Sequence, residues 1–205
     1  YMAAAGLLGW PPTVPETQMA DICGGSLQLA QAILFALLER QRTGRGKRLA
    51  VSMTAGVWPL AVAPAAFAAA GETNPLSGAY PCYNLYRTSD DDWLAVGALE
   101  AKFWRTLCAT LGRDDLVAGG LATGERGERV RRELEAVFAT RTLAQWTDVF
   151  DGVDACVTPV ATLGEALDDP QFLAREMVVR ERSGARAFAP PWTMSGSGVR
   201  AVRPA

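Results

Sequence analysis

The 205-residue sequence predicts an α/β protein in two parts. In the first part, residues 27–38 are apolar or small on every helical face, and the stretches "RLAVSM" and "TAGVWPLAVAPAAFAAAG" follow them. A helix, a buried strand and an Ala-rich helix in this order are a unit of the α/β type. After the connection "GETNPLSGAYP", alternating and then amphipathic patterns indicate a smaller α+β domain.

The first helix is expected over residues 27–38, because this apolar pattern lasts too long for a strand. Since it covers every helical face, we expect the helix to be buried. Arg40 and Arg42 suit the negative end of the helix dipole, and Gly44 or Gly46 can take the left-handed conformation that ends a helix. The next helix is expected to be kinked or broken at its prolines.

The second part begins with a predicted β-hairpin, in which residues 83–87 alternate, "SDDD" forms a solvated turn and residues 93–97 return. Three helical patterns follow in "AKFWRTLCATLG", "GERVRRELEAVFATRT" and "LAQWTDVFDG". The stretch "DACVTPV" is expected to be a short strand or an extended piece. Thr162 and Glu165 match a capping box, and the tail from Arg180 is expected to lie extended on another part of the molecule.

Composition excludes several classes of function. The formal net charge of −2 offers no polyanion-binding surface, which argues against nucleic acid as a partner. The longest apolar run, residues 57–70, is shorter than the ~20 residues of a membrane span and contains two prolines. We therefore expect no transmembrane segment, no signal peptide and a cytoplasmic location.

The sequence contains no histidine and four irregularly spaced cysteines without a CxxC pair. This composition predicts no metal site and reduced thiols. Acid–base chemistry must then come from carboxylates, Cys, Lys or Tyr.

Two carboxylates stand at candidate helix starts. Asp21, in "MADICGGSLQ", is either an N-cap or a reagent. Gly24 and Gly25 are poor helix formers, costing about 1 kcal/mol each relative to alanine, but they would let a ligand approach the backbone N–H groups. Glu100, in "AVGALEAKFW", is either a first-turn acid that suits the helix dipole or a second active-site carboxylate at a strand-to-helix junction.

Three blocks of the sequence, in this order, resemble the class III CoA-transferase superfamily (CaiB/BaiF type), and within it the α-methylacyl-CoA racemases. They are "MADICGGSLQLAQAILFALLERQRTGRGK", "YRTSDDDWLAVGALEAKFW" and "FDGVDACVTPVATLGEAL". The Asp of the family's Asp-x-x-Gly-Gly block falls on Asp21, and the Glu of the racemase block Gly-Ala-(Ile/Leu)-Glu falls on Glu100. The resemblance implies an acyl-CoA thioester as substrate, a place in lipid metabolism, and no cofactor beyond the coenzyme A of the substrate.

The resemblance also implies an architecture. Residues 1–73 would be part of a large α/β nucleotide-binding-like domain with its linker, residues 74–180 a small α+β domain, and residues 181–205 a tail that returns to the large domain. It further implies an interlocked homodimer, in which Asp21 and Glu100 would meet across subunits. The family's catalytic histidine would align just upstream of Tyr1.

Three functions follow as alternatives. In a racemase or epimerase, Asp21 would exchange the α-proton of a 2-methylacyl-CoA through an enolate. In a CoA-transferase, the same carboxylate would accept the acyl group. A third alternative is a catalytically incomplete fragment or assembly module that lacks the family histidine.

Overall fold

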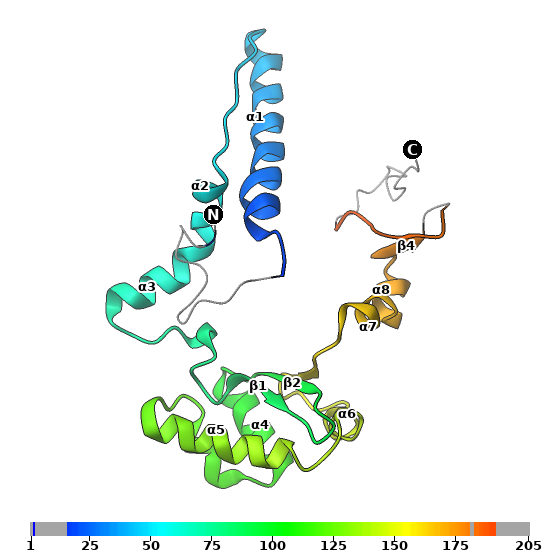
Figure 1. The fold of residues 1–205 in the computed structure, drawn as a ribbon. Helices are drawn as coiled ribbons and strands as arrows, with labels where there is room; N and C mark the ends of the chain where they lie inside the picture. Colours follow the sequence, from blue (N-terminus) through cyan, green and yellow to red (C-terminus); the bar gives the residue numbers. More distant parts are fainter. Residues whose placement is uncertain (1, 3–15, 181–182, 192–205) are drawn as a thin grey trace.

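In the computed structural model, the described residues are residue 2, residues 16–180 and residues 183–191 (Figure 1). The chain first forms a π-helical turn, η1 (Ala20–Ser26), which continues directly into α1 (Leu27–Thr43). An extended connection then returns beside α1 and leads to α2 (Met53–Val57), η2 (Trp58–Ala61) and α3 (Val62–Ala70). We call residues 20–70 the N-terminal helical segment.

Helix α1 ends as predicted but is not buried. Gly44 takes the left-handed conformation with φ 71°, and Arg40 and Arg42 lie in the last turn. The expectation of a buried helix is wrong, because none of the residues of α1 is buried and Phe35 is 71% exposed. The apolar pattern specifies a helix, but burial also requires neighbouring elements. Among the described residues, α2 packs against η1, which precedes α1, and not along the length of α1 itself.

The predicted strand "RLAVSM" is also wrong. Residues 45–52 carry no regular structure, and Ser52 instead caps α2 by accepting a hydrogen bond from the backbone N–H of Ala55. A strand satisfies its backbone only against a neighbouring strand, and the described part of the chain places none there. The expected helix–strand–helix unit is therefore a helix–loop–helix unit in this structure.

The predicted break in the Ala-rich helix is confirmed. Pro59 lies in the first turn of the 3-10 helix η2, which separates α2 from α3. Proline lacks the N–H that would continue the α-helical ladder at this point.

The α+β domain contains a three-stranded antiparallel sheet in the order β1–β2–β3. Strands β1 (Tyr83–Arg87) and β2 (Trp93–Gly97) form the predicted hairpin, and β3 (Val157–Pro159) pairs with the other edge of β2. The helical elements of this domain are α4 (Ala101–Leu111), η4 (Asp114–Gly119), α5 (Gly124–Phe138) and α6 (Leu143–Phe150), preceded by the short η3 (Pro75–Ser77).

The helices cover one face of this sheet. Tyr86, Leu94 and Val96 point toward them and are at most 3% exposed. Helices α4 and α5 lie on the same side of β1 and β2 (Figure 1). Tyr86 joins an aromatic cluster with Phe138, and Phe138 contacts the rings of Trp146 and Phe150. This core leaves the opposite face of the sheet open.

The acidic turn of the hairpin, which the sequence predicts to be merely solvated, makes hydrogen bonds to α6 and within the turn. Asp90 accepts hydrogen bonds from the backbone N–H of Leu143 at 3.0 and 3.2 Å and from the hydroxyl of Thr88. Leu143 is the first residue of α6, so the turn between β1 and β2 helps to cap a helix that begins 53 residues later.

The chain after β3 forms an arm that extends away from the α+β domain (Figure 1). It contains α7 (Leu163–Leu167), α8 (Pro170–Ala174), β4 (Val178–Arg180) and β5 (Arg186–Phe188), and none of these elements has a buried residue. Thr162 and Glu165 form the predicted capping box. The predicted domain limits at residues 73 and 180 stay predictions, and most of the predicted returning tail, 181–205, lies outside the described residues.

Two helical stretches are apolar and long enough to span a membrane when only length and composition are counted. They are Ala20–Thr43 and Met53–Ala70, each with a mean hydropathy of 1.5. These stretches were not expected from the sequence, because Pro59 and Pro64 interrupt the longest apolar run. One or two such helices are weak evidence for a membrane, because the core helices of other folded proteins and signal sequences have the same length and composition.

Candidate active site

Asp21 lies inside the π-helical turn η1 and is exposed. The N-cap of this element is Met19, which has helical backbone angles, so the capping interpretation of Asp21 is wrong. Its carbonyl oxygen accepts a hydrogen bond from the Ser26 hydroxyl at 3.1 Å. Its carboxylate has no hydrogen-bond partner among the described residues, which leaves it free to meet a substrate. Single π-turns within helices often occur at functional sites.

The glycines beside Asp21 lie where η1 and α2 cross. A Cβ atom on Gly56 of α2 would lie 2.0 Å from the carbonyl oxygen of Gly24, and one on Gly24 would lie 2.5 Å from the carbonyl oxygen of Met53. At Gly25 the nearest obstacle is only the flexible side chain of Met53, at 3.0 Å. Gly24 thus allows the backbones of η1 and α2 to touch. This packing is a structural reason for a glycine at position 24, and the local sequence pattern did not reveal it. The predicted contact of Gly24 and Gly25 with substrate stays a prediction.

Glu100 lies at the junction that the sequence predicts, three residues after β2 and at the N-cap position of α4. It is exposed, and its side chain makes no capping hydrogen bond. Trp104, one turn along α4, is anchored instead by donating its indole N–H to the carbonyl oxygen of Val117 at 2.9 Å. This bond holds the buried face of α4 against η4, and Glu100 lies at the exposed start of the helix.

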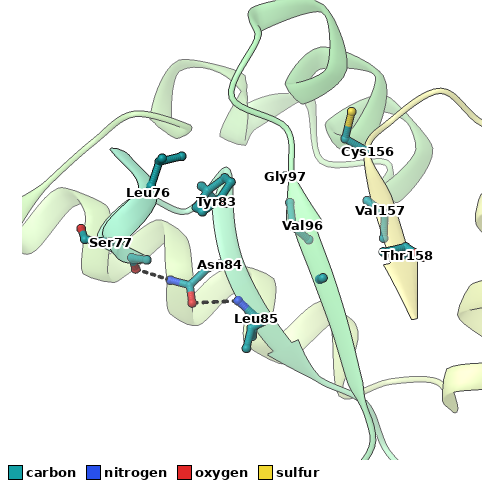
Figure 2. Close-up of a pocket in the computed structure, with 12 residues that line it drawn as sticks. Leu76, Ser77, Tyr83, Asn84, Leu85, Val96, Gly97, Cys156, Val157 and Thr158 are labelled. Carbon is teal, nitrogen blue, oxygen red and sulfur yellow. Dashed lines mark hydrogen bonds between the residues drawn. The ribbon is translucent and has the colours of Figure 1, made fainter. Parts of the chain in front are cut away.

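A groove of about 720 Å³ lies on the open face of the sheet, and we call it the sheet groove. Figure 2 shows Leu76 and Tyr83 on one side of Gly97 and Cys156 on the other. The residues that line it come from η3, the three strands and the approach to β3: Leu76, Ser77, Gly78, Tyr83, Asn84, Leu85, Ala95, Val96, Gly97, Cys156, Val157 and Thr158.

Cys156 connects the groove to Glu100. Its carbonyl oxygen accepts the backbone N–H of Gly97 at 2.9 Å, and its backbone has a φ of 52°, which is uncommon for a residue other than glycine. Desolvation raises the pKa of the Cys156 thiol, and the carboxylates of Asp154 and Glu100 raise it further, whereas Lys102 lowers it. The thiol is therefore a poor nucleophile. The hydrogen bond from Gly97 places Cys156 beside the end of β2, three residues before Glu100.

The structure brings Glu100, Cys156 and the groove together, but it shows no contact between Glu100 and Asp21. Within one chain, η1 lies with α1 and α2, and the start of α4 lies in the α+β domain (Figure 1). Sequence reasoning found both carboxylates but missed Cys156 and Gly97. The sequence around Gly97 offered one hint, which is its position as the last residue of a predicted strand.

Comparisons with known proteins agree with this fold. The profile of CoA-transferase family III matches residues 1–205. The chain is 35% identical over 181 residues to human α-methylacyl-CoA racemase, covering 82% of this chain and 47% of that protein. It is 27% identical over 190 residues to acetyl-CoA:oxalate CoA-transferase of Acetobacter aceti, covering 87% of this chain and 48% of that enzyme.

A solved structure shares the fold. A CaiB/BaiF family protein from Brucella suis superimposes with a TM-score of 0.73 at 21% identity, over 96% of this chain and 55% of that one. The chain spans about half the length of the curated relatives it matches.

Proposed function

We propose that this chain, which belongs to CoA-transferase family III, forms part of a CoA-thioester racemase or epimerase. The substrate would be a 2-methylacyl-CoA, and Asp21 would act as one acid/base. The 35% identity to a racemase, against 27% to a transferase, favours this choice within the family.

The observation that carries the proposal is the exposed carboxylate of Asp21 on a π-helical turn, without a hydrogen-bond partner among the described residues. A thioester acidifies the hydrogen on its α-carbon, so a carboxylate base can remove that proton and leave an enolate. A second group then returns a proton to the opposite face. Glu100 is exposed at the start of α4, and we assign its carboxylate to the part of the active site that lies opposite Asp21.

Proton exchange tests this function directly. The complete protein that carries this chain should incorporate deuterium at the α-carbon of 2-methylacyl-CoA in heavy water. Asp21→Asn should slow this exchange by about 10²–10⁴-fold, because it removes a positioned base. Glu16→Gln, which alters an exposed acid near the same turn, is the matched control and should leave the rate unchanged. Retained exchange in the Asp21→Asn protein would remove Asp21 from the role of base.

The second candidate function is a CoA-transferase, and the match to acetyl-CoA:oxalate CoA-transferase supports it. The Asp21 carboxylate would attack the thioester carbonyl, forming a mixed anhydride and releasing CoA thiolate. The thiolate would then attack the Asp21 carbonyl, giving an aspartyl-CoA thioester and releasing the acyl group as a carboxylate. A second carboxylate would attack the aspartyl thioester and release CoA thiolate again, and the thiolate would attack the carbonyl of the new acyl group, forming the product thioester and freeing Asp21 as a carboxylate.

Hydroxylamine separates these functions. It should convert Asp21 to a hydroxamate only in the presence of acyl-CoA if a covalent aspartyl intermediate forms, and the modified residue is identified by mass spectrometry. Absence of trapping together with α-proton exchange favours the racemase. Folding without exchange or trapping favours the third candidate, a catalytically incomplete assembly module.

We further propose that the protein acts in the cytoplasm as an interlocked homodimer, without a membrane or nucleic-acid partner and with coenzyme A entering only as part of the substrate. The separation of Asp21 from Glu100 within one chain favours a site shared between subunits. Light scattering on the complete protein tests the dimer, and fractionation of cells that produce it tests the location.

A further inference from the structure

The central strand of the sheet carries small side chains on its open face. Ala95 and Gly97 alternate with the buried Leu94 and Val96, so they point away from the core. Both have larger cross-strand neighbours in β1, because Gly97 pairs with Tyr83 and Ala95 pairs with Leu85. The sheet groove is therefore deepest over the small residues of β2, and the larger side chains of β1 border it.

The wall beside β1 is held in place by hydrogen bonds. The side-chain amide of Asn84 donates to the carbonyl oxygen of Gly78 at 2.6 Å, and its oxygen accepts the backbone N–H of Leu85 at 2.8 Å (Figure 2). These bonds tie the turn after η3 to β1. The groove is thus formed before a ligand enters, which lowers the entropy cost of binding.

Among the described residues that line the groove there is no Asp, Glu, Lys or Arg. A phosphate group binds where cations or several N–H donors meet it, so this surface does not suit the nucleotide end of coenzyme A. Its volume of about 720 Å³ falls within the usual range of small-molecule sites, about 300–1,000 Å³. An uncharged, mainly apolar group is the chemical class that fits.

One end of the groove lies next to Glu100. Gly97, in the floor, is three residues before Glu100, a separation that an extended chain spans in about 11 Å at most. Cys156 lies at the same end, because its carbonyl oxygen accepts the backbone N–H of Gly97 at 2.9 Å. An acyl chain in the groove could therefore present its α-carbon near Glu100.

We propose that the sheet groove holds the acyl chain of the acyl-CoA, and that Ala95 sets the length of chain it accepts. This proposal rests on the proposed function for the identity of the ligand. The thioester and α-carbon lie at the Gly97 end, and the chain runs over Ala95 between Leu85 and Thr158, which pair with Ala95 from either side.

The test is equilibrium binding of CoA, 2-methylpropanoyl-CoA and 2-methyldecanoyl-CoA to the complete protein, followed by calorimetry. In the unaltered protein, affinity should rise with chain length. Ala95→Phe should fill the floor and remove this dependence. Each methylene that the groove no longer holds weakens binding roughly fourfold, so the long-chain ligand should lose at least about tenfold. Binding of free CoA should stay within about twofold.

Ala109→Phe, at an exposed position on α4, is the matched control and should bind all three ligands like the unaltered protein. Ala95→Val narrows the floor less and suits a strand better, so it keeps the test decisive if Ala95→Phe fails to fold. It should reduce the long-chain affinity in the same direction by a smaller factor.

Two results would overturn the proposal: affinity that does not depend on chain length in the unaltered protein, or an Ala95 variant that keeps the full dependence or weakens all three ligands equally. Binding does not require turnover, so these outcomes are separate from proton exchange. A protein that shows the expected binding pattern without exchanging the α-proton would retain the groove assignment and reject the racemase.

Discussion

The α+β domain and the N-terminal helical segment both carry many apolar side chains, but only the domain buries them. In the domain, Phe138, Leu107 and Leu134 are completely inaccessible to solvent. In the segment, the buried apolar cluster consists of Ala20 and Val57, while Leu34 and Phe35 of α1 are 62% and 71% exposed. Local sequence is enough to specify a helix, whereas a core also depends on which elements surround it.

The largest expected effect of a single substitution tests this difference in burial. Phe138→Ala should destabilise the α+β domain by about 3–5 kcal/mol, because it removes a fully buried ring in contact with Tyr86 and Trp146. Phe35→Ala on α1 should change the unfolding free energy of the 205-residue chain by less than about 0.5 kcal/mol. Urea unfolding followed by tryptophan fluorescence measures both. Equal losses would show that α1 is covered in solution, contrary to its exposure in this structure.

A smaller effect is expected at the one close crossing within the N-terminal helical segment. Gly56→Ala places a Cβ atom 2.0 Å from the carbonyl oxygen of Gly24, so the two helices must separate. We expect a cost of about 1–3 kcal/mol, as for other overpacked contacts, and faster amide hydrogen exchange in η1.

Gly46→Ala is the control for this crossing, because a Cβ atom there has no neighbour within 4 Å among the described residues. It should leave exchange in η1 unchanged. If Gly56→Ala behaves like Gly46→Ala, the crossing does not hold the turn that carries Asp21. The segment would then lack the one packed contact that distinguishes it from an isolated helix.

The smallest effect concerns a polar contact that joins distant parts of the α+β domain. The Thr88 hydroxyl and the backbone N–H of Leu143 lower the pKa of Asp90 by hydrogen-bonding to its ionised form. The carboxylate therefore contributes stability above its unfolded pKa, about 3.9, and this contribution is lost as the pH falls through the lower folded pKa.

Asp90→Asn keeps a hydrogen-bond acceptor but does not titrate. Between about pH 5 and about pH 2, the unfolding free energy of this variant should therefore fall less than that of the unaltered protein. Thermal unfolding across this range measures the difference, and the other carboxylates act as an internal reference because both proteins contain them. Parallel pH profiles would show that the turn is solvated, as the sequence alone suggests.

Local patterns predicted the elements of the α+β domain well. The hairpin strands Tyr83–Arg87 and Trp93–Gly97 have the predicted limits, because alternation of side chains sets the face and the acidic turn sets the register. The capping box at Thr162 is likewise a property of four adjacent residues. The strand "RLAVSM" failed because a strand depends on a partner that no local pattern can supply.

The candidate site divides in the same way. Asp21 and Glu100 could be proposed from the chain alone, since each stands in a recognisable block and next to a helix start. Cys156 could not, because it reaches the end of the groove only when β3 pairs with β2 across some sixty residues of intervening sequence. The contact of Gly24 with Gly56 was also hidden, because two separate helices must cross before either glycine matters.

By itself, the sequence determined the family, the helices, the hairpin and the two candidate carboxylates. Each of these features depends on residue types and spacings within a short stretch of the chain. The tertiary structure decided the rest: that Asp21 lies within a π-turn and not at a cap, that α1 is exposed, and that Ala95 and Gly97 floor a groove beside Glu100. These features arise from contacts between residues distant in sequence, and only the folded chain brings such residues together.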